Sequence, residues 1–495
     1  TRKGAMEATS ITRNQNRTVE LGTQALHEKM EEAGRQIYDS LAEGAVHAAT
    51  EVVRNLSTWF EETIWTTYLT HLFQCREILS WLRVLGARKA LRLVSYRDVW
   101  ITLPAGTKIQ VRSPFFVKAA PRRGRKKRGP QNRGEHPLLS LMGFVHKVEP
   151  GLAFRAVQLA VLTPSFETAS RILEREGISL SPNKLRRMTA ELGPLDPCSR
   201  VDRLLESGDA SPLENRRVLL AVDGGRIRGR KNKRGRLPAG AKRRGFHTDW
   251  VEPKLFGVYA LNEDGEIVKD FDPFVDGTTG KLDAFLELLE RYLSRLGVDK
   301  ASEVVLVGDG APWIWERVPG LLRKTGGAGL KITEIVDWTH AKQNLKKAFE
   351  TLSKKKLGMV DFEHFKGLLF SGDIDGIMDE VKSLLKVKSS SKIIKKLKSY
   401  FVANKDRMRY AANRAMNRPI GSGVIESAIR RVVNMRVKAP GSFWKLGFAE
   451  TVIYLRAQLL YGRWENLADN WTRTLREDFQ AIAMASRQPR PIGTI

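Results

Sequence analysis

The sequence of 495 residues has little cysteine, no long apolar run and too few acidic residues to balance its basic ones. Its two cysteines, Cys75 and Cys198, exclude a disulfide framework and a four-cysteine zinc site, and they fit a reducing, cytoplasmic setting. No run of about 18 apolar residues occurs, which argues against a membrane span. No secretory signal opens the sequence.

Basic residues outnumber acidic residues by 84 to 55, which gives a formal net charge of +29. Because the excess is clustered along the chain, it indicates a polyanionic partner. Composition alone leaves ribosomal RNA, transfer RNA and DNA open. Hydrophobic residues make up 42% of the chain, enough for a folded core, and the length predicts about three or four domains.

The N-terminal part is predicted to hold two regions. Apolar residues recur at three- and four-residue steps, which predicts a helical domain over residues 1–99 that either dimerises or simply packs. Residues 100–150 are predicted to form a β-rich segment with a Gly-flanked basic loop, which either contacts phosphates or is solvated. The candidate DNA-binding residues of that loop are Arg122, Arg123, Arg125, Lys126, Lys127 and Arg128.

Residues 151–205 have the pattern of a helix-turn-helix DNA-binding domain. Ser165 is placed to cap a first helix, and Ser181-Pro182 opens a second one. In such a motif the second helix enters the major groove of double-stranded DNA, although many helical hairpins bind nothing. We therefore expect DNA contacts from basic residues early in that helix, namely Lys184, Arg186 and Arg187.

Two buried strands that end in aspartate mark a catalytic core. One apolar run leads into Asp223 and a second leads into Gly308-Asp309. The predicted order, three strands, a helix and a fourth strand, matches the α/β RNase H-like fold, in which strands one and four lie side by side. The two carboxylates would then lie close together, where they repel each other unless they share a cation.

The rest of this core is predicted from shorter signals. A strand over residues 254–261 is joined by a hairpin at Asp264-Gly265 to a strand over residues 267–275. A fifth strand ends at Asp337. The predicted regions are the first part of the core over residues 212–344, a lysine-rich helical insertion over residues 345–415, the final core helix over residues 416–440 and a helical C-terminal region over residues 441–495.

A third carboxylate is expected on the final core helix. Ser422 is placed to cap that helix, which puts Glu426 about one turn in and Arg430 on the same face. Glu426 is otherwise an ordinary glutamate favoured by the helix dipole. Three such acids suit two Mg²⁺ ions, with Mn²⁺ as a substitute. One ion would activate a water or 3′-hydroxyl, and the other would stabilise the leaving oxygen.

Several motifs resemble the conserved blocks of DDE transposases, in particular bacterial insertion-sequence enzymes related to the Mutator-like group. The motifs lie at residues 221–226, 307–315, 335–340, 421–427 and 434–438. The resemblance implies an RNase H-like core with a helical insertion, and Mg²⁺-dependent cleavage and strand transfer at transposon ends. It assigns catalytic and metal-binding roles to Asp223, Asp309 and Glu426.

The resemblance also extends to residues around these acids. It implies active-site support from Asp337 and His340, although His340 is equally explained as a packed residue at a helix start. DNA contacts are expected from Arg430, Arg436 and Lys438.

The resemblance implies a homo-oligomer, expected to be a dimer, that acts on transposon ends and target DNA in a prokaryotic cytoplasm and nucleoid. Two other functions stay open. One is a different RNase H-like nuclease of the resolvase type. The other is a domesticated DNA-binding protein without catalysis, which would bind DNA with strong salt dependence but without metal.

Overall fold

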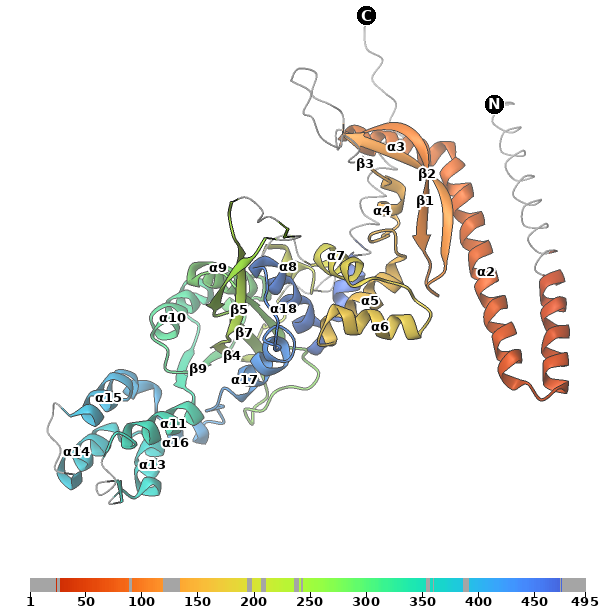
Figure 1. The fold of residues 1–495 in the computed structure, drawn as a ribbon. Coiled ribbons are helices and arrows are strands. Elements are labelled where there is room, and N and C mark those ends of the chain that lie inside the picture. The colour runs from red at the N-terminus through yellow and green to blue at the C-terminus, as the bar shows by residue number, and fades with distance from the viewer. Residues whose placement is uncertain are drawn as a thin grey trace, which may run out of the picture. The chain divides into compact units, whose positions relative to one another are not determined.

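A computed structural model gives the fold of the chain (Figure 1). It describes residues 24, 27–88, 91–118, 134–193, 198–205, 211–235, 240–241, 244–352, 357–358, 360–385, 391–471 and 473. The chain divides into two compact units, the first with residues 1–156, 171–180 and 473–495, the second with residues 157–170 and 181–472. No helix among the described residues is long and apolar enough to cross a membrane.

The predicted basic loop falls outside the described residues. Its candidate DNA-binding residues therefore stay predictions, and they are Arg122, Arg123, Arg125, Lys126, Lys127 and Arg128.

The first unit packs helices against a small antiparallel sheet of order β1-β2-β3. Leu69 and Leu82 from the helices share a buried core with Ile101 and Phe116 from the strands. β1 starts at Leu91, before the predicted β-rich segment. The elements are a helix over residues 27–42, α2 (Val46–Gln74), α3 (Arg76–Arg88), β1 (Leu91–Thr102), β2 (Lys108–Lys118), β3 (Gly134–Glu135), α4 (Pro137–Leu141) and part of α5 (Pro150–Leu162).

The second unit is built on a mixed five-stranded sheet of order β10-β9-β4-β7-β8. β4 pairs in parallel with β9 and antiparallel with β7, so the first and fourth strands of this sheet lie side by side as expected. The central strands are buried on both faces, as their apolar, β-branched sequences predict. The strands are β4 (Arg217–Gly224), β7 (Lys254–Leu261), β8 (Phe274–Thr278), β9 (Glu303–Gly308) and β10 (Ile332–Val336).

Helices accompany this sheet and fill the predicted insertion. One of them, α9, ends at Gly297, whose φ of 75° favours glycine. The helices are α6 (Phe166–Arg175, in part), α7 (Pro182–Leu192), α8 (Cys198–Asp202), α9 (Leu282–Leu296), α10 (Pro312–Gly326), α11 (Trp338–Phe349), α13 (Phe362–Ser371), α14 (Ile374–Leu385), α15 (Lys392–Tyr400), α16 (Tyr410–Ala415), α17 (Gly423–Ala428) and α18 (Leu446–Leu460).

The third strand of the sheet differs from its prediction. The hairpin at Asp264-Gly265 forms, with Gly265 at φ 79°. The strand expected over residues 267–275 is reduced to a bridge at Ile267, and β8 begins only at Phe274. The physical reason is that Pro273 lacks an N–H and follows a charged turn, so the chain cannot continue the ladder before Phe274.

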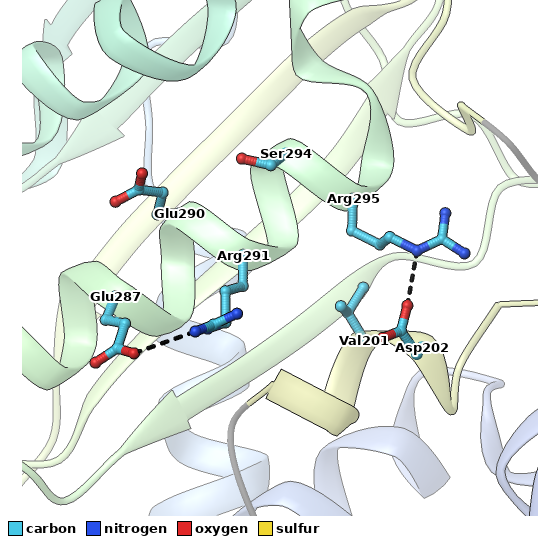
Figure 2. Close-up of a pocket in the computed structure, with 7 residues that line it drawn as sticks. All are labelled: Val201, Asp202, Glu287, Glu290, Arg291, Ser294 and Arg295. Atoms are coloured by element: carbon cyan, nitrogen blue, oxygen red, sulfur yellow. Dashed lines mark hydrogen bonds and ion pairs between the residues drawn. The ribbon is translucent and has the colours of Figure 1, made fainter.

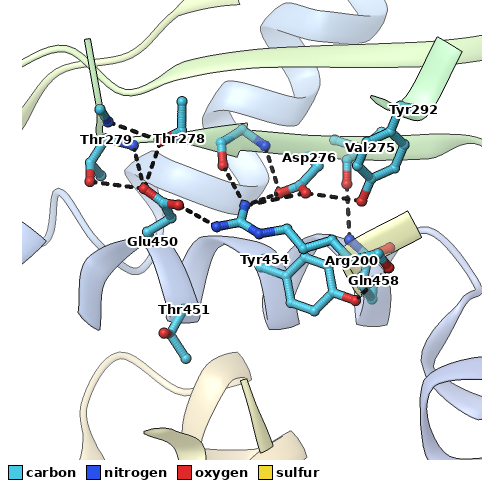
Figure 3. A network of polar contacts seen from close by, with 12 residues as sticks. Arg200, Val275, Asp276, Thr278, Thr279, Tyr292, Glu450, Thr451, Tyr454 and Gln458 are labelled. Atoms are coloured by element: carbon cyan, nitrogen blue, oxygen red, sulfur yellow. Dashed lines mark hydrogen bonds and ion pairs between the residues drawn. The ribbon is translucent and has the colours of Figure 1, made fainter. Parts of the chain in front are cut away.

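A buried polar network ties α8 and α18 to β8 (Figure 3). Arg200 Nη1 lies 3.2 Å from Asp276 Oδ1, and Arg200 Nη2 pairs with Glu450 Oε1. Tyr292 donates a hydrogen bond to Asp276 Oδ2 at 2.9 Å, and Thr278 Oγ1 donates to Glu450 Oε2 at 2.7 Å. Every buried charge in this network therefore has an opposite charge or a hydrogen-bond donor beside it.

Candidate active site and nucleic-acid interface

The sheet brings two of the predicted acids to one edge. β4 and β9 are parallel neighbours whose register makes Asp223 and Asp309 leave the sheet at the same end. Asp223 Oδ1 accepts the N–H of Gly224 at 2.7 Å, and Asp309 Oδ1 accepts the N–H of Ala311 at 2.9 Å. No further hydrogen bond to either carboxylate is seen among the described residues. Both side chains are half-buried, so their remaining lone pairs face a partly open space.

The electrostatics of Asp223 place the other predicted groups nearby. Burial raises the pKa of Asp223 to about 6, although the N–H of Gly224 opposes the change. The negative charges of Asp309 and Glu426 raise the pKa further, and His340 lowers it. The charges of Asp309 and Glu426 therefore lie close enough to Asp223 to repel it.

Glu426 lies on α17 beside a histidine from α11. His340 Nε2 is 3.2 Å from Glu426 Oε1, and both side chains are part-exposed. The predicted capping of α17 by the Ser422 hydroxyl is wrong, because Ser422 has φ −95° and ψ 19° and its side chain makes no capping hydrogen bond. Its backbone N–H instead donates to Asp337 Oδ2. Glu426 pairs with His340 rather than with Arg430, which is exposed on the same helical segment.

Asp337 connects the elements that carry His340 and Glu426. It is 1% exposed, and its Oδ1 accepts the N–H of His340 at 2.6 Å while its Oδ2 accepts the N–H of Ser422. Ligand atoms of Asp337, His340 and Glu426 all lie within 4.8 Å of one another. Because both oxygens of Asp337 already accept N–H groups, it is suited to positioning, whereas Asp223 and Asp309 have lone pairs left for a cation.

The insertion contributes a residue that sequence reasoning missed. Tyr400, at the end of α15, packs against the turn after Asp309 so closely that a Cβ on Gly310 would lie 2.0 Å from its ring. Burial raises the pKa of Tyr400 to about 12, and the charges of Asp309 and Asp337 raise it too. The only sequence signal was a glycine pair around Asp309, which required a close neighbour but did not identify it.

One tryptophan after Asp309 also has a clear place. Trp315 is 8% exposed, and its indole N–H donates to the backbone oxygen of Asp309 at 2.9 Å. The packing of Trp315 therefore fixes the turn that carries Asp309.

The predicted DNA contacts around the last core helix divide into two kinds. Arg430 and Lys438 are exposed. Arg436 is not, which corrects the expectation of a direct DNA contact. It is 2% exposed, its guanidinium donates to the backbone oxygen of Pro164 at 3.0 Å, and it lies 5.1 Å from the ring centroid of Trp444. Backbone carbonyls and an aromatic ring satisfy its donors inside the fold.

The second helix of the predicted helix-turn-helix forms with its cap. Ser181 Oγ accepts the N–H of Lys184 at 3.3 Å, and Pro182 occupies the first turn of α7. Arg186 and Arg187 are exposed on this helix, and Lys184 is half-buried. Contact between these residues and DNA stays a prediction.

A two-stranded ribbon between β4 and β7 was not predicted from the sequence. β5 (Ile227–Asn232) and β6 (Phe246–Val251) pair antiparallel and are mostly exposed. The available signal was the alternation of arginines in residues 226–230, directly after Asp223.

Two hollows in the second unit differ in charge. One, of about 500 Å³, lies on α9 beside α8 (Figure 2). Its acidic side chains are all paired, Glu287 with Arg291 at 3.4 Å, Asp202 with Arg295 at 2.7 Å and Glu290 with Lys324 at 2.6 Å, so the hollow offers no unpaired charge to a ligand. The other, of about 580 Å³, is lined by aromatic and basic side chains without an acid among its lining residues.

Comparison with known proteins adds one distant similarity. No family model matches the chain, and no curated protein matches it. Among solved structures, it is similar to a chain of the Drosophila P element transposase strand transfer complex, at 14% identity and a TM-score of 0.26. The alignment covers 69% of this chain and 92% of that chain. Because a TM-score this low does not relate two folds in detail, function is inferred from the site itself.

Proposed function

We propose that the protein is a DDE transposase, an enzyme that cuts DNA at transposon ends and joins the ends to target DNA. The observation that carries this proposal is the convergence of Asp223, Asp309 and Glu426 at one edge of the five-stranded sheet. An RNase H-like core is supported by the strand order, in which the second and third strands extend antiparallel from one side of the first, and the fourth and fifth extend parallel from the other.

The donor set fits Mg²⁺ or Mn²⁺. Three carboxylates crowd together beside the imidazole of His340, and oxygen ligands of this kind suit Mg²⁺. Two bound ions would activate the attacking oxygen and stabilise the leaving oxygen of a phosphoryl displacement. Asp223 and Asp309 would hold the metals, Glu426 would complete the set, and His340 and Asp337 would fix the position of Glu426.

Sequence recognition of the ends is assigned to the helix-turn-helix. Its second helix, α7, is capped and presents Arg186 and Arg187 to solvent, as a helix that enters the major groove requires. The net charge of +29 supports a polyanionic partner.

A dimer is proposed from the long helix of the first unit. Val46, Val53, Phe60, Ile64 and Tyr68 recur at seven- and four-residue steps along α2, and each is at least 43% exposed. An exposed apolar stripe along one face of a helix is typical of a surface that packs against a partner, so we propose that a second copy of the chain covers it.

Light scattering tests this dimer. The double variant Val53→Glu/Phe60→Glu is expected to halve the measured mass, because two charges would be buried in the interface. Val94→Glu, on β1 and 51% exposed, is the matched control and should keep the mass. An unchanged mass in the double variant would remove α2 from the interface.

The proposed activity is tested with labelled DNA that carries the element's own ends. Wild type is incubated with Mg²⁺, Mn²⁺ or EDTA beside Asp309→Asn. Metal-dependent cleavage at the end boundary and joining to a target, both lost in the variant, are expected. Cleavage without joining and without end preference would instead indicate a resolvase-type nuclease, and salt-sensitive binding without cutting would indicate a non-catalytic DNA-binding protein.

A further inference from the structure

The β5–β6 ribbon starts and ends beside the candidate acids. β5 begins shortly after Asp223, and β6 leads into β7, whose first residue Lys254 lies opposite Gly224. The N–H of Gly225 donates to the backbone oxygen of Pro253 at 2.8 Å, which closes the base of the ribbon. A ligand bound along the ribbon would therefore have one end near Asp223.

One face of the ribbon combines guanidinium groups with aromatic rings. Side chains alternate between the faces of a strand, and Arg228 lies opposite Trp250 while Arg230 lies two residues further along. Trp250 is 54% exposed, with the guanidinium carbon of Arg226 at 4.6 Å from its ring centroid. Phe246, near the other end of this face, is 38% exposed. The rings therefore keep much of their surface open to solvent.

The acidic charge of the ribbon is on its other face. Asp249 is the single acid in the two strands, and it lies opposite Gly229, where its carboxylate pairs with Lys231 Nζ at 3.1 Å. The face that carries Arg228 and Trp250 therefore has a net positive charge.

The same face continues into the groove of about 580 Å³. Arg230 lines this groove together with Arg186 and Arg187 of α7 and with Phe443 and Trp444. The groove is fixed to the ribbon, because the N–H of Arg230 donates to the backbone oxygen of Trp444 at 2.8 Å and the N–H of Trp444 donates to that of Arg228 at 3.0 Å. Ribbon and groove form one surface between Asp223 and α7.

We propose that the ribbon face, which comprises Arg228, Arg230, Phe246 and Trp250, binds an unpaired stretch of DNA strand next to the cleavage site, and that the groove joins this face to the duplex-binding helix α7. The inference rests on the proposed function and deepens it, because it names the state of the DNA that the active site receives.

Open aromatic rings favour an unpaired strand over a duplex. Bases in a duplex cover each other's faces, so an exposed tryptophan has nothing to stack on. Bases of a single strand expose their faces and stack on such rings, while arginines hold the phosphates and also stack. A surface for duplex backbone alone would need the positive charge but not Trp250 and Phe246.

Fluorescence anisotropy on the full chain, in EDTA, tests the ribbon face. The probes are a blunt DNA duplex and the same duplex with a short unpaired flap. Wild type is expected to bind the flap probe more tightly. Trp250→Ala is expected to reduce this preference by about tenfold, the scale of one lost base–aromatic stack. Trp250→Phe, which keeps a ring, should retain most of the preference.

Trp100→Ala is the matched control, because Trp100 is 58% exposed on β1 of the other unit. It should keep the wild-type preference. The proposal would be overturned if wild type bound both probes with equal affinity, or if Trp250→Ala lost affinity equally for both. It would also be overturned if single-stranded RNA competed with the flap probe more strongly than single-stranded DNA did. Because EDTA prevents cleavage, a protein that prefers the flap but never cuts would refute the proposed activity alone.

Discussion

Two clusters of carboxylates in the second unit differ in what neutralises them. In the first, Asp276 and Glu450 surround Arg200, whose side chain is 6% exposed, and the Asp276 side chain is 0% exposed (Figure 3). In the second, Asp223, Asp309 and Glu426 gather at the edge of the sheet, where the nearest basic side chain is the imidazole of His340, with its Nε2 3.2 Å from Glu426 Oε1.

The difference follows from the cost of buried charge. A carboxylate far from water is tolerated only when it is paired and hydrogen-bonded, and Arg200 supplies both conditions. Carboxylates that repel each other without such a partner raise the free energy of the folded state, and a divalent cation removes that repulsion. The first cluster therefore stabilises the fold, and the second is where the proposed function would require a cation from solution.

The largest effect expected from this comparison is on catalysis. Asp309→Asn removes a metal ligand and is expected to lower cleavage by about 10⁴-fold, the scale for one member of a catalytic unit. Because a repulsive charge is lost, its metal-free melting temperature should equal or exceed that of wild type. Asp283→Asn, whose carboxylate is 84% exposed, is the matched control for both measurements. Full activity in Asp309→Asn would remove Asp309 from the site.

The opposite result is expected in the buried cluster. Arg200→Met leaves two carboxylates without a cation and should lower the free energy of unfolding by about 3–5 kcal/mol in urea titrations. The exposed Arg291 pairs with Glu287 at 3.4 Å, and Arg291→Met should cost less than about 1 kcal/mol. Adding Glu450→Gln to Arg200→Met should restore part of the loss. A cost below about 1 kcal/mol for Arg200→Met would contradict the contrast between the clusters.

A smaller effect is expected where an aspartate positions another acid. Asp337→Asn cannot accept both the His340 and Ser422 N–H groups, so α17 should lose its fixed position. Cleavage should fall by about 10- to 100-fold, as for other groups that orient metal ligands, and half-maximal activity should require more Mg²⁺.

Asp361 offers a matched control for this variant. It caps α13 and accepts the N–H groups of Glu363 and His364 at 3.0 and 3.2 Å, and neither partner belongs to the candidate site. Asp361→Asn should change stability without raising the Mg²⁺ requirement. Equal Mg²⁺ requirements in both variants would mean that Asp337 only stabilises a helix.

The sequence predicted those features that local patterns determine. The adjacent positions of Asp223 and Asp309 at the strand ends were predicted correctly, because buried strands have continuous apolar runs and parallel neighbours end together. Capping signals placed α7 correctly because its Ser181-Pro182 start is local. The Ser422 cap was wrong because the Ser422 backbone, whose N–H donates to the distant Asp337, has a ψ of 19° instead of the extended conformation of a capping residue.

The remaining features depend on contacts between distant segments. Arg436 has the sequence of an exposed basic residue, yet it is buried because it meets carbonyls near residue 164. The ribbon was missed because arginines and glycines occupy the positions where apolar alternation signals a strand, and its stability comes from cross-strand pairs such as Arg228 with Trp250. Neither contact can be predicted from the local sequence pattern.

The smallest expected effect is on the pH dependence of stability, which distinguishes the two clusters without an activity measurement. In the metal-free protein the pKa of Asp223 is raised to about 6, whereas an unfolded aspartate titrates near about 3.9. Between these values the unfolded chain releases a proton that the folded protein keeps. The free energy of unfolding therefore falls as pH rises from about 4 to about 6. Above about pH 6 this group causes no further fall.

Melting temperatures measured in EDTA between pH 4.5 and 7 should show this loss in wild type and a shallower one in Asp223→Asn. Mg²⁺ should reverse the sign for wild type alone, because the ion binds the ionised carboxylate and stabilises the fold more as pH rises. If the melting temperatures of both proteins depend on pH in the same way, with and without Mg²⁺, Asp223 is not part of a cation site. The carboxylates at the sheet edge would then need no added cation, like those around Arg200.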